Sequence, residues 1–274
     1  MSSAALNVPD HNARLAALLS KRKRFAAEWT GPPLSGKTLA LGEAASLAAG
    51  VWGCAVERFA LLAPTTAGAR VLRRAVTDAA FGPGFPLTNL FERGVELTGA
   101  IADVAYAHSP QRARVTPQLQ KAAAAEYCAR IRRAAGIAPG DPAGVRFMRA
   151  RLRQVSAAIG FLDHVWLQRQ DLAEAYSAGL ERGLDLPNPT QWLDLIEFWA
   201  HFKTRERAVE ASDILSGPLY PDDACPLVLF DDADEAGPLA RDAVARLFPR
   251  AAVLISAAAP GCLGRPLAGS FALG

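Results

Sequence analysis

Eight residues near the start of the chain have the types and spacing of a phosphate site. They run Gly31-Pro32-Pro33-Leu34-Ser35-Gly36-Lys37-Thr38. Gly, four residues and then Gly-Lys-Thr is the pattern of a phosphate-binding loop (P-loop), in which glycines let backbone N–H groups turn toward phosphate oxygens. We expect Lys37 to reach the terminal phosphates of a nucleotide and the Thr38 hydroxyl to ligate Mg²⁺. The alternative interpretation is a Pro/Gly turn with a solvated lysine.

A second group of residues supplies carboxylates. Asp231-Asp232-Ala233-Asp234-Glu235 directly follows Leu227–Phe230, an apolar run typical of a buried strand. Ligands of parallel sheets bind at the carboxyl ends of strands, and a P-loop needs an acidic residue on a neighbouring strand to hold Mg²⁺. We therefore expect Asp231 to bind the metal ion. The alternative is an acidic cap of the following helix.

The surrounding patterns predict the elements that position these residues. A strand over 25–29 leads into the loop and an Ala/Leu-rich helix over 38–49 leaves it, which places a helix N-terminus against the anion. Further along we expect, in order, a strand over 58–63, a helix over 66–80, a strand over 226–230, a helix over 238–247 and a strand over 251–256. This alternation predicts an α/β fold with a parallel sheet.

The middle of the chain has a different pattern. Four helical segments are separated by Pro/Gly breaks and contain almost no strand signal. They cover residues 117–134, 144–159, 161–180 and 190–209. We therefore expect a helical insertion over residues 98–215, with residues 1–97 and 216–274 forming the two parts of a nucleotide-binding domain.

Composition limits the classes of protein to consider. Of 274 residues, 51% are hydrophobic and 21% are charged, which is typical of a soluble globular protein. No apolar run approaches the ~20 residues that a membrane span needs, and the N-terminus lacks the pattern of a signal peptide. The four cysteines are scattered without the spacing of a metal site. We expect a cytoplasmic protein with reduced thiols and no membrane partner.

Positive charge is concentrated in one segment. Residues 111–153 contain ten basic and two acidic residues, a charge of +8 in a chain whose net charge is +3. Such a segment suits the phosphate backbone of nucleic acid. The candidate contacts are Arg112, Arg114, Arg130 and Arg133. A solvated helix face with no ligand explains the same charges equally well.

Taken with their order, these motifs give the chain a family resemblance. It resembles the first motor domain of UvrD/Rep-type superfamily 1 DNA helicases, a RecA-like P-loop NTPase domain with a helical 1B insertion. Four segments besides the P-loop carry the resemblance: Ala63-Pro64-Thr65-Thr66-Ala67-Gly68-Ala69-Arg70, Pro86-Leu87-Thr88-Asn89-Leu90-Phe91, Glu210-Ala211-Ser212-Asp213-Ile214-Leu215 and the run from Leu229 to Leu239. Their order and spacing agree over nearly the whole chain.

The resemblance implies roles for individual residues. Lys37 and Thr38 would bind ATP and Mg²⁺, and Asp231 would complete the metal shell. Asp232 stands where the family has its catalytic glutamate. Thr65 and Thr88 stand in the segments that contact single-stranded DNA.

Several departures from the family pattern point to weak turnover. Asp232 is one methylene shorter than the glutamate it replaces, and Asp234 replaces a glutamine. No Gly-Asp-X-X-Gln sequence follows Val253–Ser256, and Pro32 and Pro33 remove backbone donors from the loop. The family also needs a second RecA-like domain with an arginine finger, and none follows within the 274 residues.

The sequence therefore predicts an ATP-binding, helicase-like protein that binds single-stranded DNA or a DNA-repair partner. We expect weak or no autonomous ATP hydrolysis and no self-sufficient unwinding; any activity would be that of an ATPase. A protein partner could supply the second motor domain. The alternative function is a nucleotide-dependent protein-interaction module that does not bind DNA.

Overall fold

The computed structural model describes residues 8–21, 24–85, 98–110, 112–138, 141–261 and 268–272. The chain divides into two compact units. Unit 1 comprises Met1–Pro110 and Gly217–Gly274, and unit 2 comprises Gln111–Ser216. The junctions expected from the sequence were after residues 97 and 215.

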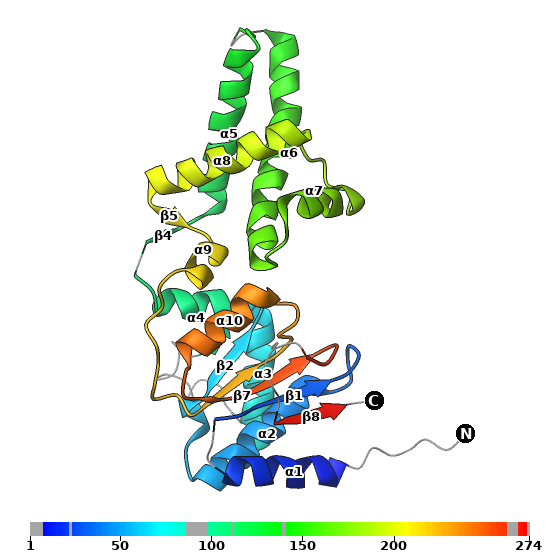
Figure 1. Cartoon of the computed structure of the whole chain (residues 1–274), viewed down its shortest axis with the longest axis vertical. Coiled ribbons are helices and arrows are strands. Elements are labelled where there is room, and N and C mark those ends of the chain that lie inside the picture. The colour runs from blue at the N-terminus through cyan, green and yellow to red at the C-terminus, as the bar shows by residue number, and fades with distance from the viewer. Residues whose placement is uncertain are drawn as a thin grey trace, which may run out of the picture. The chain divides into compact units, whose positions relative to one another are not determined.

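Six strands from the described residues form the sheet of unit 1 (Figure 1). Their order is β3 (Thr98–Ala100), β2 (Ala60–Ala63), β6 (Leu227–Phe230), β7 (Ala252–Ala257), β1 (Ala26–Thr30) and β8 (Gly269–Ala272). Every neighbouring pair in this order runs parallel. The predicted α/β class with a parallel sheet is confirmed. Because β7 lies between β1 and β6, the carboxyl ends of these three strands meet at one edge.

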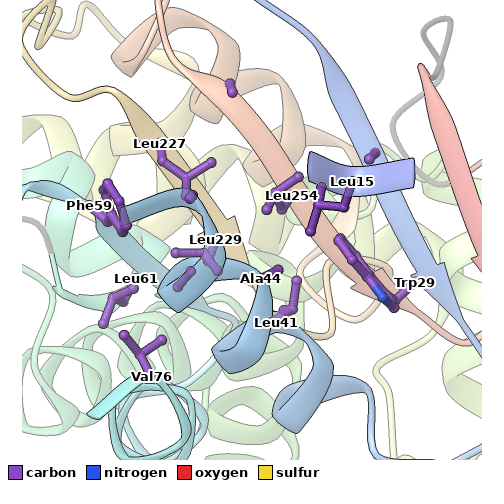
Figure 2. Packing of buried hydrophobic residues seen from close by; sticks show 14 of the residues in the cluster. Leu15, Trp29, Leu41, Ala44, Phe59, Leu61, Val76, Leu227, Leu229 and Leu254 are labelled. Atoms are coloured by element: carbon purple, nitrogen blue, oxygen red, sulfur yellow. The ribbon is translucent and has the colours of Figure 1, made fainter. Parts of the chain in front are cut away.

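Helices α1 (Val8–Ser20), α2 (Lys37–Trp52) and α3 (Thr66–Phe81) build a hydrophobic core with the sheet. Figure 2 shows Leu41 of α2 and Val76 of α3 beside strand residues that include Leu229 and Leu254. The residues of β1, β2, β6 and β7 are buried on both faces of the sheet, which is typical of parallel sheets. Two further helices of unit 1, α4 (Ile101–Ala107) and α10 (Gly237–Leu247), contact each other.

Helices α2 and α3 approach closely at one glycine. A Cβ built on Gly42 of α2 would stand 2.6 Å from the backbone carbonyl oxygen of Ala75 in α3. Real Cβ atoms essentially never come this close to a backbone atom, so the contact requires a residue without a side chain. Gly42 therefore fixes how α2, which begins at Lys37, lies on its neighbour.

Unit 2 is built mainly of helices. They are α5 (Pro117–Ala134), α6 (Pro142–Leu167), α7 (Leu172–Glu181), α8 (Pro189–Glu206) and α9 (Ala211–Ser216), with a small parallel pair β4 (Ala113–Arg114) and β5 (Ala208–Val209). Trp192, Trp199 and Tyr127 are fully buried in its core. These aromatic residues therefore serve packing. In the described part of the chain, no helix combines the length and hydropathy needed to cross a bilayer.

The predicted break between two helices of unit 2 is in the wrong place: it lies between Leu167, where α6 ends, and Leu172, where α7 begins, and not at Gly160. The sequence suggested separate helices over 144–159 and 161–180 with a break at Gly160, but α6 runs unbroken through this residue. The neighbours Ile159 and Phe161 are both buried in the core of unit 2, whereas Gly160 is exposed. Packing of those side chains outweighs the roughly 1 kcal/mol that a glycine costs inside a helix.

Candidate functional site

The loop from Gly31 to Gly36 joins β1 to α2 at the carboxyl edge of the sheet. Gly36 precedes α2 with φ 86°, in the left-handed region where glycine avoids the steric cost that a Cβ brings. Among the described residues, no side chain caps the N-terminus of α2. The first backbone N–H groups of a helix have no partner within it, and together with the helix dipole they suit an anion.

The tip of this loop is exposed and tightly turned. Leu34 has φ 66° and is fully exposed to solvent. The backbone N–H of Ser35 donates to the carbonyl oxygen of Pro32 over 3.3 Å, which closes the turn. The Ser35 Oγ atom is buried and has no hydrogen-bond partner within the described part of the chain. Because a buried hydroxyl without a partner is unfavourable, this group is a donor suited to an oxyanion.

Lys37 lies across the loop. Its side chain is largely buried, and its Nζ donates to the carbonyl oxygens of Gly31 at 2.9 Å and Pro32 at 3.1 Å. These two bonds hold the ammonium group beside the N-terminus of α2, where a phosphate would be attracted by both. The predicted phosphate-binding lysine is thus positioned by the backbone of its own loop.

Thr38, at the start of α2, and Asp231, after β6, are in contact at the carboxyl edge of the sheet. The Thr38 Oγ1 donates to Asp231 Oδ2 at 2.7 Å, although 193 residues separate them in sequence. Asp231 directly follows β6 and is 3% exposed. Its other oxygen, Oδ1, accepts a 2.5 Å hydrogen bond from Ser256 Oγ on β7. Two hydroxyl groups from different elements therefore fix the orientation of this carboxylate.

Asp232 lies beside Asp231 in an unusual backbone conformation. Its φ of 47° is in the left-handed region, which aspartate tolerates better than most residues. Its backbone N–H donates to Ser256 Oγ at 2.9 Å. Burial raises the pKa of the Asp232 carboxyl above its ordinary value, the charges of Asp231 and Glu235 raise it further, and the Lys37 ammonium opposes them. A proton-accepting group with a raised pKa is a frequent feature of functional sites.

The sequence patterns did not predict the role of Ser256. This fully buried serine contacts Asp231 and the backbone of Asp232, and its own carbonyl oxygen accepts from the N–H of Ala233 at 2.9 Å. Asp234 Oδ2 accepts from the N–H of Ala258 at 3.0 Å, a second link between the segments that follow β6 and β7. The sequence signal for this role was that Ser256 is a single polar residue at the end of the apolar run Val253–Ile255.

The donor set of Thr38 and Asp231 suits Mg²⁺. A hydroxyl and a carboxylate are hard oxygen ligands, and magnesium is usually bound by one or two carboxylates together with water and substrate phosphates. In the described residues, no three His, Cys, Asp or Glu side chains gather into a fuller metal site. Phosphate and water would therefore have to supply the remaining ligands.

The candidate DNA contacts are distributed over both units. Thr65 caps α3, since its Oγ1 accepts from the N–H of Gly68 at 3.1 Å. Thr88 lies outside the described residues. In unit 2, Arg112 lines a pocket of about 640 Å³ together with Lys203 and Arg207, and Arg114 is exposed on β4.

The two candidate arginines of α5 have partners on the protein. Arg130 forms an ion pair with Asp194 of α8 at 2.8 Å. Arg133 Nε donates weakly to the carbonyl oxygen of Ala129 at 3.4 Å. The contact of Arg130 with Asp194 competes with any phosphate at this position.

Comparisons with known proteins add no family to this geometry. No protein-family model matches the chain, and no match was found among the curated proteins.

Proposed function

We propose that this protein is an ATP-binding, helicase-like P-loop protein with a RecA-like core. In this proposal it binds single-stranded DNA or a DNA-repair partner and hydrolyses ATP weakly or not at all on its own. Lys37 and the N-terminus of α2 bind the phosphates, and Thr38 and Asp231 hold Mg²⁺.

The observation that carries the proposal is the 2.7 Å hydrogen bond between Thr38 Oγ1 and Asp231 Oδ2. The alternative interpretation, a Pro/Gly turn with a solvated lysine, does not predict this contact. The Thr38 hydroxyl, which follows the lysine, meets the Asp231 carboxylate, which follows β6 of the same parallel sheet. A Mg²⁺ site next to a bound nucleotide requires such a pair of ligands. The largely buried Lys37 adds a cation beside the same edge.

Weak hydrolysis follows from Asp232. Hydrolysis needs a carboxylate that orients the attacking water, and a 1 Å misplacement can cost about 10²-fold in rate. The backbone of Asp232 is anchored to Ser256 Oγ, so the residue has little freedom to advance its shorter side chain. Asp234, at the position of the family's coupling glutamine, is engaged by the backbone of Ala258.

The alternative, a protein-interaction module, has its own support in unit 2. Arg130 pairs with Asp194, and Arg205 forms two hydrogen bonds with Glu126. Each of these guanidinium groups is paired with a carboxylate and is therefore less available to the phosphates of DNA. They favour a nucleotide-dependent module without DNA binding, which salt-dependent binding experiments would separate from the first proposal.

Nucleotide binding is tested by thermal unfolding with and without Mg·ATP. At a ligand concentration about 100 times Kd, binding to the folded state adds roughly 2.7 kcal/mol to the unfolding free energy and raises Tm. We expect Lys37→Ala to abolish this rise and Asp231→Asn to abolish its dependence on Mg²⁺. Lys21→Ala, which removes an exposed lysine at the end of α1, is the matched control. Absence of any rise in the parent protein would refute the proposal.

DNA binding is tested with a fluorescent single-stranded oligonucleotide at several salt concentrations. Contacts to phosphates predict that log K falls with log salt by about 0.7 for each phosphate neutralised. Absence of binding at low salt, or binding that does not depend on salt, would support the interaction module. An increase in ATPase rate on adding the oligonucleotide would link the two units functionally.

A further inference from the structure

A pocket of unit 1 lies at the amino edge of the sheet, where the parallel strands begin. It has a volume of about 320 Å³ and is lined by Arg24, Trp52, Cys54, Arg58, Pro226, Arg250 and Ala252. Arg24, Pro226 and Arg250 precede β1, β6 and β7, whereas the Gly31–Thr38 loop follows β1. The pocket and the loop therefore lie at opposite edges of one sheet.

Backbone hydrogen bonds make the walls of this pocket rigid. The N–H of Ala252 donates to the carbonyl oxygen of Pro226 at 3.1 Å, and the N–H of Val253 donates to that of Phe25 at 2.9 Å. The N–H of Cys54 donates to the carbonyl oxygen of Ala49 at 3.1 Å. The segments that carry the lining side chains are thus fixed before any ligand binds, which reduces the entropic cost of binding.

The charged residues of the lining are all arginines. Arg24, Arg58 and Arg250 come from three separate segments, and none of the described residues that line the pocket is a carboxylate. Asp223 approaches Arg250 from outside the lining at 3.4 Å, in a pair whose two side chains are more than half exposed. A pair of this kind is weak, so the guanidinium groups remain able to bind an anion.

Trp52 is the aromatic residue of the lining. Its Nε1 donates to the carbonyl oxygen of Leu19 at 2.9 Å, and its ring meets that of Phe59 edge-on, with centroids 6.3 Å apart. These two contacts hold the indole in one orientation, while part of its surface lines the pocket. A fixed aromatic ring next to arginines is the arrangement that stacks a planar ring and pairs its charged substituent.

We propose that this pocket binds a phosphate monoester that carries a planar ring, such as a mononucleotide. The guanidinium groups of Arg24, Arg58 and Arg250 pair with the phosphate oxygens, because a planar fork of N–H donors matches phosphate geometry. The ring stacks on Trp52. This site is separate from the Gly31–Thr38 loop, and the inference does not depend on the proposed function.

Cys54 makes the pocket testable, since its thiol is part of the lining and is half-buried. The rate of alkylation of Cys54 is measured by peptide mass spectrometry in a Lys37→Ala background without Mg²⁺, so that binding at the loop does not contribute. AMP at ten times its Kd is expected to slow this rate about tenfold, as the fraction of empty sites falls. Adenosine and inorganic phosphate protect less at the same concentration.

Substitutions of the lining residues test whether AMP protects Cys54 by binding in this pocket. Arg58→Gln is expected to weaken AMP binding about tenfold, the loss of one charged hydrogen-bonding group. Trp52→Leu is expected to reduce the advantage of AMP over inorganic phosphate. Arg153→Gln removes an exposed arginine of unit 2 and is the control for net charge. A 5′-phosphorylated oligonucleotide, compared with its 5′-hydroxyl form, shows whether the phosphate belongs to a free nucleotide or to a DNA end.

Two results would overturn the inference. One is an alkylation rate of Cys54 that no phosphate monoester changes. The other is protection that Arg58→Gln leaves intact, which would place the ligand elsewhere. Circular dichroism of each variant separates loss of binding from loss of folding.

Discussion

Ser256 holds one oxygen of Asp231 while Thr38 holds the other. Ser256→Ala removes the donor to Asp231 Oδ1 and the acceptor of the Asp232 N–H at a fully buried position. Because both groups would be left without a partner, we expect a loss of about 1–3 kcal/mol in the free energy of unfolding. Urea unfolding measures it. Ser20→Ala, at an exposed serine, should change stability by no more than about 0.5 kcal/mol.

The close approach of α2 and α3 predicts opposite effects of one substitution at two glycines. At Gly42 a new Cβ would meet the Ala75 carbonyl oxygen, so Gly42→Ala should destabilise by about 1–3 kcal/mol. At Gly50, on the same helix, a Cβ meets none of the described residues within 4 Å, and Gly50→Ala should stabilise by about 0.5–1 kcal/mol. Thermal unfolding of the pair measures both. Equal effects would show that α2 does not pack on α3 in this way.

The raised pKa of Asp232 predicts a pH-dependent stability difference. A carboxyl whose pKa is higher in the folded state is more favourable protonated, so its ionisation costs stability as pH rises through the folded pKa. Asp232→Asn should therefore be more stable than the parent at pH 7. The difference should disappear below about pH 4, the ordinary range of an aspartate. Glu43→Gln, on an exposed part of α2, controls for net charge.

Lys203 anchors a buried polar cluster in unit 2. Its Nζ contacts Glu210 at 2.9 Å and Asp213 at 2.6 Å. Burial alone would lower the pKa of Lys203, but the two carboxylates more than offset this and the pKa is raised. Lys203→Met would leave a buried carboxylate without its cation, and we expect a loss of about 3–5 kcal/mol in urea unfolding followed by tryptophan fluorescence.

The control for Lys203 is Arg205, which forms an exposed ion pair with Glu126 at 2.7 Å. Arg205→Met should have a much smaller effect, because solvent screens this pair. If both substitutions cost the same, the cluster around Lys203 does not stabilise unit 2 through its buried charges.

If unit 2 binds DNA, substitutions of Arg112 and Arg130 should have different effects on the affinity for DNA and on its salt dependence. Arg112 lines a pocket of unit 2, and Arg130 lies on α5 in an ion pair with Asp194. Arg112→Gln should weaken binding of a single-stranded oligonucleotide and reduce the salt slope by about 0.7, the value for one phosphate contact. Arg130→Gln should leave the slope nearly unchanged. The reverse order would assign the contact to α5.

Patterns carried by neighbouring residues predicted part of the fold correctly. The strand before Gly31 and the helix after it were predicted within a few residues, because apolar runs and Gly/Lys spacing are local signals. The same is true of α5, predicted over 117–134. The approach of Thr38 to Asp231 was expected because both follow parallel strands.

The features that could not be predicted from the sequence depend on contacts between segments that are distant in the chain. Strand β8 has only four residues, including two glycine or alanine positions, and it exists because it pairs with β1. The role of Ser256 follows from the register of β7 beside β6, which one sequence does not reveal. The continuity of α6 through Gly160 was missed because its packing partners lie on other helices.

The order of the strands has a consequence for synthesis of the chain. Both neighbours of β1, β7 and β8, belong to the C-terminal segment Gly217–Gly274. At about 5–20 residues per second, a ribosome makes Thr30 roughly 10–45 s before Ala252. Unit 2 is continuous in sequence and can fold during that interval. Strand β1 has no strand partner until β7 has been synthesised. A nascent chain released before β7 emerges would therefore expose both edges of β1 to chaperones and to other chains.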